Sequence, residues 1–510
     1  MSKTNQSLKN VTSAFAFFFF KVVLSFFSRA IFIKALGSDL IGLNTTILNI
    51  VGMFNLAELG IYTAISGMLY KPLHEKDYAT VERIVKIHKV LYRRIGLAIL
   101  VLGLILLPIL PFYLKNPSIP WYYVDFTFVV MLIGVLSSYF FNYRQILLWA
   151  NQEGYKATNI GESISRLKVI LQIGCVYAIT DHVYLYWLLI ELIMQVALVI
   201  LLDKQVNKSF PWLSQVQKVG IDNTIKETLW FQIKRVFVYQ VSKVVLINMS
   251  PVVVFYYLDF NTVTIYSNYM IILTMLTQIS KMISSSVVAS IGHLIAENNK
   301  TQERKVFFEY MALVYFFAGV LFVGYYSNIN SLIAGIFGKQ FLLTDQNVLF
   351  LSILIFVIGI RDVVETFLTA HAVYTDVLAP VFEVVIHIAS VYILGGLYGL
   401  SGVIIGLIFS ELSMFLWKPM FFSYKIRLVS VVDYGKRFVK YACILGFGGY
   451  VYFKFLLPLT GYTSSSLLPM LGNILINGSL IVIVYFLCFF VLDVSFRQLI
   501  ARMVAVVRRR

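Results

Sequence analysis

The chain has 510 residues, of which 59% are hydrophobic and only 13% are charged. An ordinary soluble domain is about half apolar and about one quarter charged. Too few charged residues remain to cover the surface of soluble domains, and the same composition excludes a disordered or collagen-like chain. The sequence therefore predicts a protein that crosses a membrane many times.

The charge balance is basic, with 42 Lys and Arg against 25 Asp and Glu and a formal net charge of +17. In a membrane protein, basic residues hold cytoplasmic loops in place, so we expect no nucleic-acid partner. The cysteines lie in apolar stretches without CxxC spacing, which indicates buried thiols and neither a disulfide nor a metal site. These are Cys175, Cys443 and Cys488.

The first apolar segment could be taken for a signal peptide, because Lys3 and Lys9 precede the run from Val11 to Phe20. The run continues to Ile33 without a clear small-residue cleavage site. We therefore expect an uncleaved first membrane helix.

Further along the chain, apolar runs reach the length of about 20 residues that a membrane helix needs. The run 455–492 has no charge over 38 residues and divides near Pro458 into two helices. Runs of this length exclude a membrane β-barrel. The sequence predicts an all-α integral membrane protein of about 14 transmembrane helices, at 11–36, 45–69, 91–113, 121–148, 160–180, 183–202, 229–249, 260–290, 306–326, 348–371, 378–395, 400–421, 437–457 and 472–492.

Lys and Arg residues are distributed very unequally between the two sets of connecting segments. One set, which includes both ends of the chain, holds 28 of them, and the other holds only Lys115 and Lys339. This asymmetry predicts that both termini are cytoplasmic. The longest cytoplasmic connection, 203–228, mixes apolar and basic residues, which fits either an interfacial helix or a solvated linker.

No enzyme motif is recognisable: the sequence lacks a Walker A loop, HExxH and GxSxG. It also lacks the sizeable outer loop that a membrane glycosyl polymerase would be expected to need. We therefore expect a protein that is not an enzyme, with no catalytic residue, no cofactor and no metal.

Charged residues inside the apolar spans are the most informative, since each costs a few kcal/mol unless it faces a cavity or a partner. The first and seventh predicted helices each hold three cations and no acid, although Lys34, Lys234 and Arg235 lie near helix ends and could also snorkel. Arginine and lysine side chains that line a cavity favour a phosphate or pyrophosphate cargo. The predicted cationic cavity consists of Arg29, Lys21, Lys234, Arg235, Lys243 and Arg361.

Acids inside the spans fit either ion coupling or helix pairing, and the candidates are Glu58, Glu365 and Glu411. Some acids lie four residues from a basic partner, a spacing at which the two charges can neutralise each other on one helix face. These pairs are Glu162 with Arg166, Arg361 with Glu365, and Glu383 with His387.

An ordered set of short motifs resembles the bacterial polysaccharide flippases of the O-antigen or capsule type. These belong to the multidrug/oligosaccharidyl-lipid/polysaccharide exporter superfamily. The resemblance extends from residue 10 to about residue 425. The motifs are Leu36-Gly37, Gly42-Leu43-Asn44, Leu56-Ala57-Glu58-Leu59-Gly60-Ile61, Leu69-Tyr70-Lys71-Pro72-Leu73, Arg144-Gln145, Gly154-Tyr155, Tyr266-Ser267-Asn268-Tyr269, the run from Ser290 to Glu297, Gly399-Leu400-Ser401-Gly402 and Trp417-Lys418-Pro419.

The resemblance implies two six-helix lobes around a central cavity that opens alternately to each side, plus two further helices. In this chain the lobes would occupy 1–228, which includes the cytoplasmic linker, and 229–424. The segment 425–510 would hold helices 13 and 14 and a basic tail. Arg29 matches a basic residue near the end of the family's first helix.

The resemblance further implies a cargo and partners. The cargo would be an undecaprenyl-pyrophosphate-linked oligosaccharide, moved from the inner to the outer leaflet of the bacterial plasma membrane, and the other partners would be membrane lipids and polysaccharide assembly proteins. One departure is that many relatives carry Asp-Asn where this chain has Ser242-Lys243, which puts a cation-coupling role there in doubt. Two alternatives remain: a flippase for the peptidoglycan precursor lipid, which the sequence separates poorly from the first interpretation, and an H⁺- or Na⁺-coupled exporter of small cations or drugs from the same superfamily.

Overall fold

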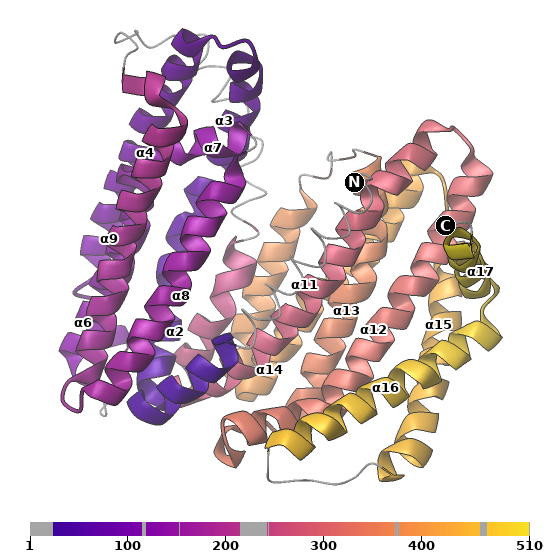
Figure 1. Ribbon diagram of the computed structural model, residues 1–510. Helices are drawn as coiled ribbons and strands as arrows, with labels where there is room; N and C mark the ends of the chain where they lie inside the picture. The colour runs from indigo at the N-terminus through magenta and orange to yellow at the C-terminus, as the bar shows by residue number, and fades with distance from the viewer. Residues whose placement is uncertain are drawn as a thin grey trace. The chain divides into compact units, whose positions relative to one another are not determined.

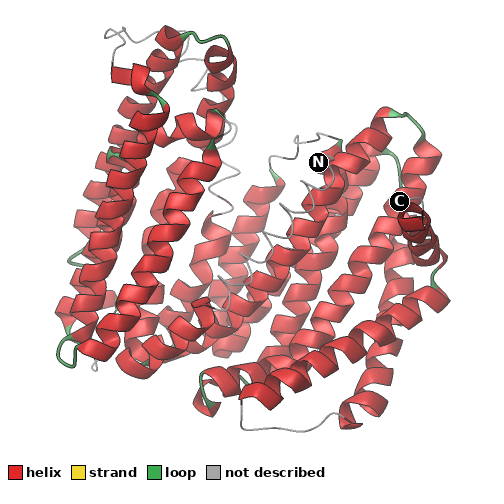
Figure 2. Cartoon of the chain, in the orientation of Figure 1, coloured by secondary structure: helices red, strands yellow, loops and turns green. Residues whose placement is uncertain are grey.

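The computed structural model describes residues 24–114, 119–151, 153–214, 242, 244–371, 373, 376, 378–459 and 467–508. Within these ranges the chain is helical, with short connections and no strand (Figure 2). The predicted all-α fold is therefore confirmed.

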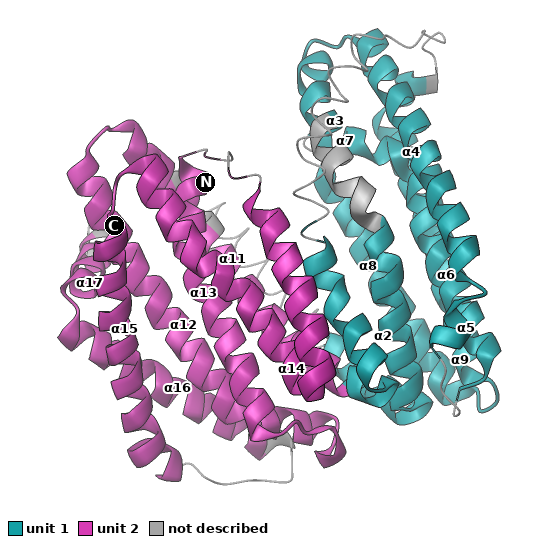
Figure 3. Ribbon diagram, turned by 180° about the vertical axis from the view of Figure 1, so that it is seen from behind, with its two compact units in different colours: residues 1–264 teal, residues 265–510 magenta. Residues whose placement is uncertain are grey.

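The chain forms two compact units, residues 1–264 and 265–510 (Figure 3). The division falls inside one helix, α11 (Phe260–Ala296). The lobe boundaries expected from the sequence, after residues 228 and 424, stay predictions. Each unit is described below by itself.

The helices of unit 1 pack mainly around α6 and α9, which contact each other and most of their neighbours (Figure 1). Thr127 of α6 and Tyr184 of α9 are both buried, and their hydroxyls are 2.8 Å apart. The helical segments are 24–36, α2 (Ser38–Gly52), α3 (Leu56–His74), α4 (Tyr78–Leu106), α5 (Leu110–Tyr113), α6 (Trp121–Phe140), α7 (Ile146–Ala150), α8 (Gly154–Ala178), α9 (Val183–Ser209) and Val244–Tyr257.

Two features of unit 1 differ from the predicted spans. Helix α4 begins at Tyr78 and not at residue 91, because Asp77 caps it by accepting a hydrogen bond from the Thr80 amide at 3.0 Å. The predicted span 45–69 is divided into α2 and α3 by a short 3₁₀ turn, Met53–Asn55. Hydropathy detects only the apolar part of a helix, so neither polar extensions nor such interruptions are visible to it.

The helices of unit 2 pack around α12, which contacts α13, α15, α16 and α17. Aromatic rings fill the contact between α12, α13 and α14, where Phe307 lies 4.9 Å from Phe367 and 5.3 Å from Phe422, measured between ring centres. The helices are α11, α12 (Lys300–Ile336), α13 (Asp345–Ala370), α14 (Ala379–Ile426), α15 (Val431–Val451), α16 (Leu467–Leu492) and α17 (Val494–Arg508).

The long helix α14 is a hairpin of two helical arms. The chain reverses at Gly399, whose φ of 58° and ψ of −134° lie outside the helical region and are readily adopted only by glycine. The arms then pack tightly: a Cβ on Gly402 would lie 1.7 Å from the Leu394 carbonyl oxygen, and Ser390 Oγ donates to the Gly406 carbonyl at 2.9 Å. The reversal falls in the turn predicted between the spans 378–395 and 400–421.

Among the described residues, seven helices are long and apolar enough to cross a membrane. Each of the fourteen predicted spans overlaps a helical segment in the described part of the chain. The predicted cytoplasmic connection 203–228 begins as the end of α9 and continues as a 3₁₀ turn, Pro211–Ser214. The rest of that segment lies outside the described residues.

Candidate functional site

A cluster of ion pairs centred on Arg361 lies within unit 2. Arg361 Nε is 2.7 Å from Glu365 Oε1, and Arg361 Nη1 is 2.8 Å from Glu411 Oε2. The same Nη1 also pairs with Glu383 Oε1. One guanidinium therefore binds three carboxylates. We call these four residues the Arg361 cluster.

Helix geometry explains how residues distant in sequence meet here. Arg361 and Glu365 are four residues apart on α13 and so lie on one face of that helix. Glu383 and Glu411 lie on the two arms of α14, which run side by side because the chain reverses at Gly399. Ser410 Oγ donates to the Glu383 carbonyl at 3.4 Å, which places the two arms in register at this level.

The Arg361 cluster is formally acidic and largely shielded from solvent. The Glu383 side chain is 4% exposed and that of Arg361 is 18% exposed, whereas Glu365 reaches 36%. One positive charge stands against three carboxylates, and Lys281 of α11 and Lys418 of α14 supply further positive charge near Glu365. Buried charges persist only when they are paired, so the cluster holds α13 to both arms of α14.

A further carboxylate, Asp362, lies beside the cluster on α13. Asp362 accepts a hydrogen bond from the Ser284 hydroxyl of α11, and Ser284 is buried. The α13–α14 connection is fixed in a similar way, because Asp376 accepts from Trp417 Nε1 at 2.9 Å and pairs with Lys418 at 3.5 Å. Acidic groups therefore link α11, α13 and α14.

The structure brings together three site residues that the sequence had assigned to two different groups. Arg361 belongs to the predicted cationic cavity, while Glu365 and Glu411 are candidates for ion coupling or helix pairing. The contact of Arg361 with Glu365 at four-residue spacing is confirmed. The place of Arg361 in a cationic cavity stays a prediction, and its carboxylate partners would have to move before it could hold an anion.

Arg29 lies in the helical segment 24–36 of unit 1 and is partly buried. One turn further along, the Phe32 ring meets Trp187 of α9 edge-on, with ring centres 5.7 Å apart. Lys21, Lys234, Arg235 and Lys243 lie outside the described residues, and so does the side chain of Glu58 on α3. Their predicted roles therefore rest on the sequence.

Glu383 was not among the predicted site residues, because its four-residue spacing from His387 had suggested a partner on its own helix. The structure instead places Glu383 against Arg361 of the preceding helix, and it records no Glu383–His387 ion pair in the part it describes. Short connections between consecutive apolar spans could have suggested this pairing, since such helices are usually neighbours.

Unit 1 contains a comparable but simpler pair. Lys168 of α8 lies 2.8 Å from Glu191 of α9, and Gln172 Nε2 donates to the other Glu191 oxygen at 3.3 Å. The predicted pair of Glu162 with Arg166 is present as a looser contact of 4.0 Å. These contacts neutralise charges within helices that the sequence places in the membrane.

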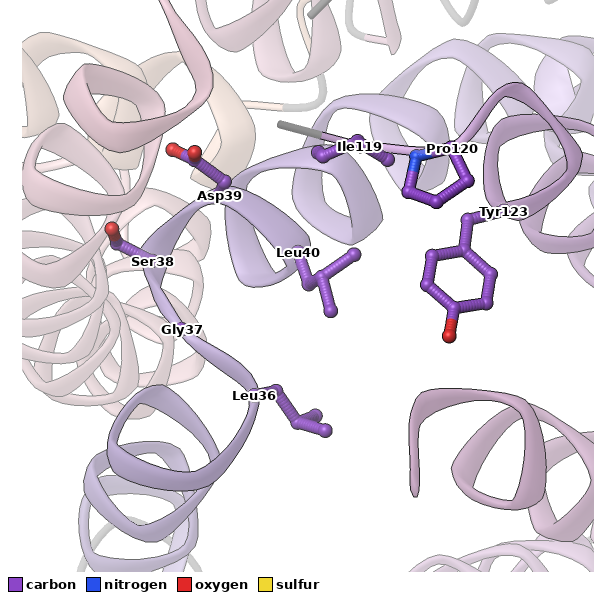
Figure 4. A pocket seen from close by; sticks show the side chains of 8 residues that line it. All are labelled: Leu36, Gly37, Ser38, Asp39, Leu40, Ile119, Pro120 and Tyr123. Atoms are coloured by element: carbon purple, nitrogen blue, oxygen red, sulfur yellow. The ribbon is translucent and has the colours of Figure 1, made fainter. Parts of the chain in front are cut away.

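A cavity of about 280 Å³ opens in unit 1 between the start of α2 and the start of α6. Leu36, Leu40 and the Tyr123 ring face it, while Ser38 and Asp39 point away (Figure 4). The described residues that line it include no basic side chain of the kind that an anion would need. Among the described residues, no group of His, Cys, Asp and Glu side chains is arranged to hold a metal ion.

Comparison with solved structures finds the same fold in membrane transport proteins. The lipid II flippase MurJ in an inward closed conformation aligns with a TM-score of 0.64 at 16% identity, over 92% of this chain and 97% of the flippase. An inward-facing multidrug resistance MATE family transporter of the MOP superfamily aligns with a TM-score of 0.57 at 14% identity, over 79% and 95% of the two chains. A Vibrio cholerae MATE transporter gives 0.53 at 13% identity, over 80% and 94%.

No protein-family model matches the sequence, and the search of curated proteins gave no match. The structural likeness nevertheless covers 92% of the chain for the flippase and 79% for the multidrug transporter, so the chain has a fold found in the MOP superfamily. Together with its long apolar helices, this fold is that of a multi-pass membrane protein. The three solved proteins are named as a flippase and as transporters, and none is named as an enzyme. This agrees with the superfamily resemblance seen in the sequence motifs.

Proposed function

We propose that this protein is a flippase for an undecaprenyl-pyrophosphate-linked oligosaccharide. It would move the lipid-linked glycan from the inner to the outer leaflet of the bacterial plasma membrane by alternating access. The proposal places both termini in the cytoplasm, as the distribution of Lys and Arg predicts. Polysaccharide assembly proteins are the proposed partners, and O-antigen or capsule precursors are the proposed glycans.

The observation that carries the proposal is the extent of the likeness to the lipid II flippase. That alignment covers 92% of this chain, whereas the two MATE transporters cover 79% and 80%. The chain therefore matches the lipid flippase over a part that the MATE transporters leave unmatched. This greater extent supports the proposed lipid-linked cargo over a small soluble one.

The predicted cations supply the chemistry for the pyrophosphate. Arg29 on the first helix and Lys243 on the seventh lie away from the predicted helix ends, where a charge is costly unless it serves a partner. A guanidinium binds phosphate oxygens through a planar fork, and an ammonium acts as a point charge. A pyrophosphate would occupy such groups, while the polyprenyl chain remains in lipid.

Transport in this direction does not require an ion gradient. One charge that crosses the whole membrane potential gains or loses about 2.3 kcal/mol per 100 mV. A pyrophosphate with about two charges would gain roughly 4–5 kcal/mol per 100 mV as it moves outward from a negative interior. The main obstacle is then the hydrophilic glycan, which a polar cavity would shelter.

A flipping assay with Arg29→Ala tests this proposal. Purified protein is placed in liposomes with a fluorescent undecaprenyl-pyrophosphate sugar, and a membrane-impermeant reagent quenches the outer leaflet. We expect wild-type protein to transfer the lipid and Arg29→Ala to lose about tenfold or more in rate, as expected for one charge-assisted contact. Arg29→Lys, which keeps the charge, should retain part of the rate, and equal rates in all three proteins would contradict the proposal.

A second candidate function is an H⁺- or Na⁺-coupled exporter of small cations or drugs. The observation in its favour is the Arg361 cluster, where three carboxylates gather around one guanidinium. An imposed H⁺ or Na⁺ gradient would drive such a protein to export a small cation in exchange for the ion. The lipid-linked sugar would stay in its leaflet. The same liposomes, loaded with an ion gradient and a fluorescent cation, distinguish the two functions.

A further inference from the structure

Helix α17 is joined to the membrane-spanning part of unit 2 with almost no linker. The apolar helix α16 ends at Leu492, and α17 begins at Val494 after the single residue Asp493. Asp493 is fully buried, pairs with Arg437 at 3.2 Å and with Lys440 at 2.7 Å, and accepts from the Phe496 amide at 2.8 Å. The start of α17 is therefore fixed to the end of the apolar helix α16.

The first half of α17 packs on the bundle through its apolar stripe. Phe496 is 1% exposed, and its ring centre lies 5.4 Å from that of Phe316 on α12 and 5.6 Å from that of Phe489 on α16. Leu499 is also buried. Arg502 closes this contact by pairing with Glu309 of α12, whose side chain is 2% exposed.

The apolar stripe of α17 extends further than the part that packs against the bundle. Met503 follows Phe496 and Leu499 at helical spacing, yet it is 54% exposed, and the next residue, Val504, is 44% exposed. Arg497 is exposed on the side of the helix. Residues 493–510 contain five arginines and one acid, the buried Asp493.

We propose that α17 lies in the membrane interface and binds anionic phospholipid, with Met503 in the acyl-chain boundary and Arg497 at the headgroups. Because α17 follows the membrane helix α16 directly, the surface available to the exposed part of its apolar stripe is lipid. A basic helix with an apolar stripe is the pattern of an interfacial helix, and its positive charge complements an anionic leaflet. The proposal rests on the membrane fold and does not depend on the cargo.

The depth of Met503 can be measured in the full-length protein. The three native cysteines are replaced (Cys175→Ala, Cys443→Ala, Cys488→Ala), and a polarity-sensitive fluorophore is attached to Met503→Cys or, as a control, to Ala501→Cys. Ala501 is exposed on the opposite face of α17. In nanodiscs that contain phosphatidylglycerol and nitroxide-labelled lipid, we expect a blue-shifted and quenched signal at position 503 only. Equal quenching at both positions, or none at 503, would overturn the proposal.

The preference for anionic lipid has a separate test. Nanodiscs are assembled from a mixture of phosphatidylcholine and phosphatidylglycerol, and the lipid that stays bound after extraction is quantified by mass spectrometry. We expect phosphatidylglycerol to be enriched on wild-type protein and its affinity to fall about fivefold in Arg497→Gln. The neighbouring Gln498→Ala should leave the enrichment unchanged. No enrichment on the wild type, or the same enrichment in Arg497→Gln, would show that α17 has no headgroup site at Arg497.

Discussion

Arg361 of α13 and Glu383 of α14 form an ion pair in which the carboxylate side chain is only 4% exposed. Arg361 also binds Glu365 and Glu411, so a single guanidinium joins α13 to both arms of the α14 hairpin. Removal of the cation would leave three carboxylates without their common partner. The Arg361 cluster therefore links these three helical segments.

Replacement of Arg361 by glutamine should lower the free energy of unfolding by about 3–5 kcal/mol, because breaking a buried ion pair leaves an uncompensated charge. Thermal and denaturant unfolding in detergent measure this. Arg166→Gln is the control, since Arg166 has a carboxylate partner at 4.0 Å, Glu162, and both side chains are about one third exposed, so we expect a smaller loss. Similar losses in the two variants would show that the Arg361 cluster does not hold the helices.

A second change tests whether repulsion between carboxylates is the cause. Adding Glu383→Gln to Arg361→Gln removes the most buried of the three acids. We expect the double variant to recover part of the lost stability, because fewer charges are then left without a partner. A double variant less stable than Arg361→Gln alone would contradict this explanation.

The close packing of the two α14 arms leaves no room for a side chain at Gly402. A Cβ at this position would lie 1.7 Å from the Leu394 carbonyl oxygen, so Gly402→Ala forces the arms apart and should destabilise the protein by about 1–3 kcal/mol or more. Gly324→Ala in α12 is the control, since a Cβ there meets nothing within 4 Å. That control should be neutral or stabilising by up to about 1 kcal/mol. Unfolding midpoints of the two variants measure this difference. Equal midpoints would show that the α14 arms tolerate a side chain at Gly402.

Asp493 should control the attachment of α17 to the bundle. Asp493→Asn removes the charge that pairs with Arg437 and Lys440, and we expect faster hydrogen exchange throughout 494–508. The control is Asp433→Asn, which loses only the more exposed pair with Arg304. If exchange in α17 rises equally in the two variants, or in neither, the buried pairs of Asp493 do not fix this helix.

The proposed flippase should respond to the membrane potential. Because the pyrophosphate is anionic, a potential that is negative on the side of origin should speed transfer, and reversal of the potential should slow it. Liposomes with a potassium gradient and valinomycin provide both conditions. A rate that is independent of the potential, combined with dependence on an H⁺ or Na⁺ gradient, would favour the cation-coupled exporter.

The helical fold was predictable because long apolar runs in a membrane leave few alternatives. Each predicted span overlaps a described helix, and even the reversal near Gly399 falls where the sequence placed a turn. The ends of helices were less predictable. The early start of α4 depends on the Asp77 cap, which lies in a polar segment that hydropathy assigns to a loop.

The site was only partly predictable, because sequence spacing reports contacts within one helix. It correctly paired Arg361 with Glu365. The Arg361–Glu383 and Arg361–Glu411 contacts link different helical arms, and they depend on the hairpin geometry of α14. A charge inside an apolar span shows that a partner is needed, but it does not say which helix provides that partner.

The most direct test of the proposed function compares two lipids in the same flipping assay. One is an undecaprenyl-pyrophosphate oligosaccharide, and the other carries the same glycan on the same polyprenyl chain without phosphorus. We expect wild-type protein to transfer the first at least about tenfold faster, because only the first offers an anion to the predicted cations. Equal transfer of both lipids, or transfer of neither, would contradict the account.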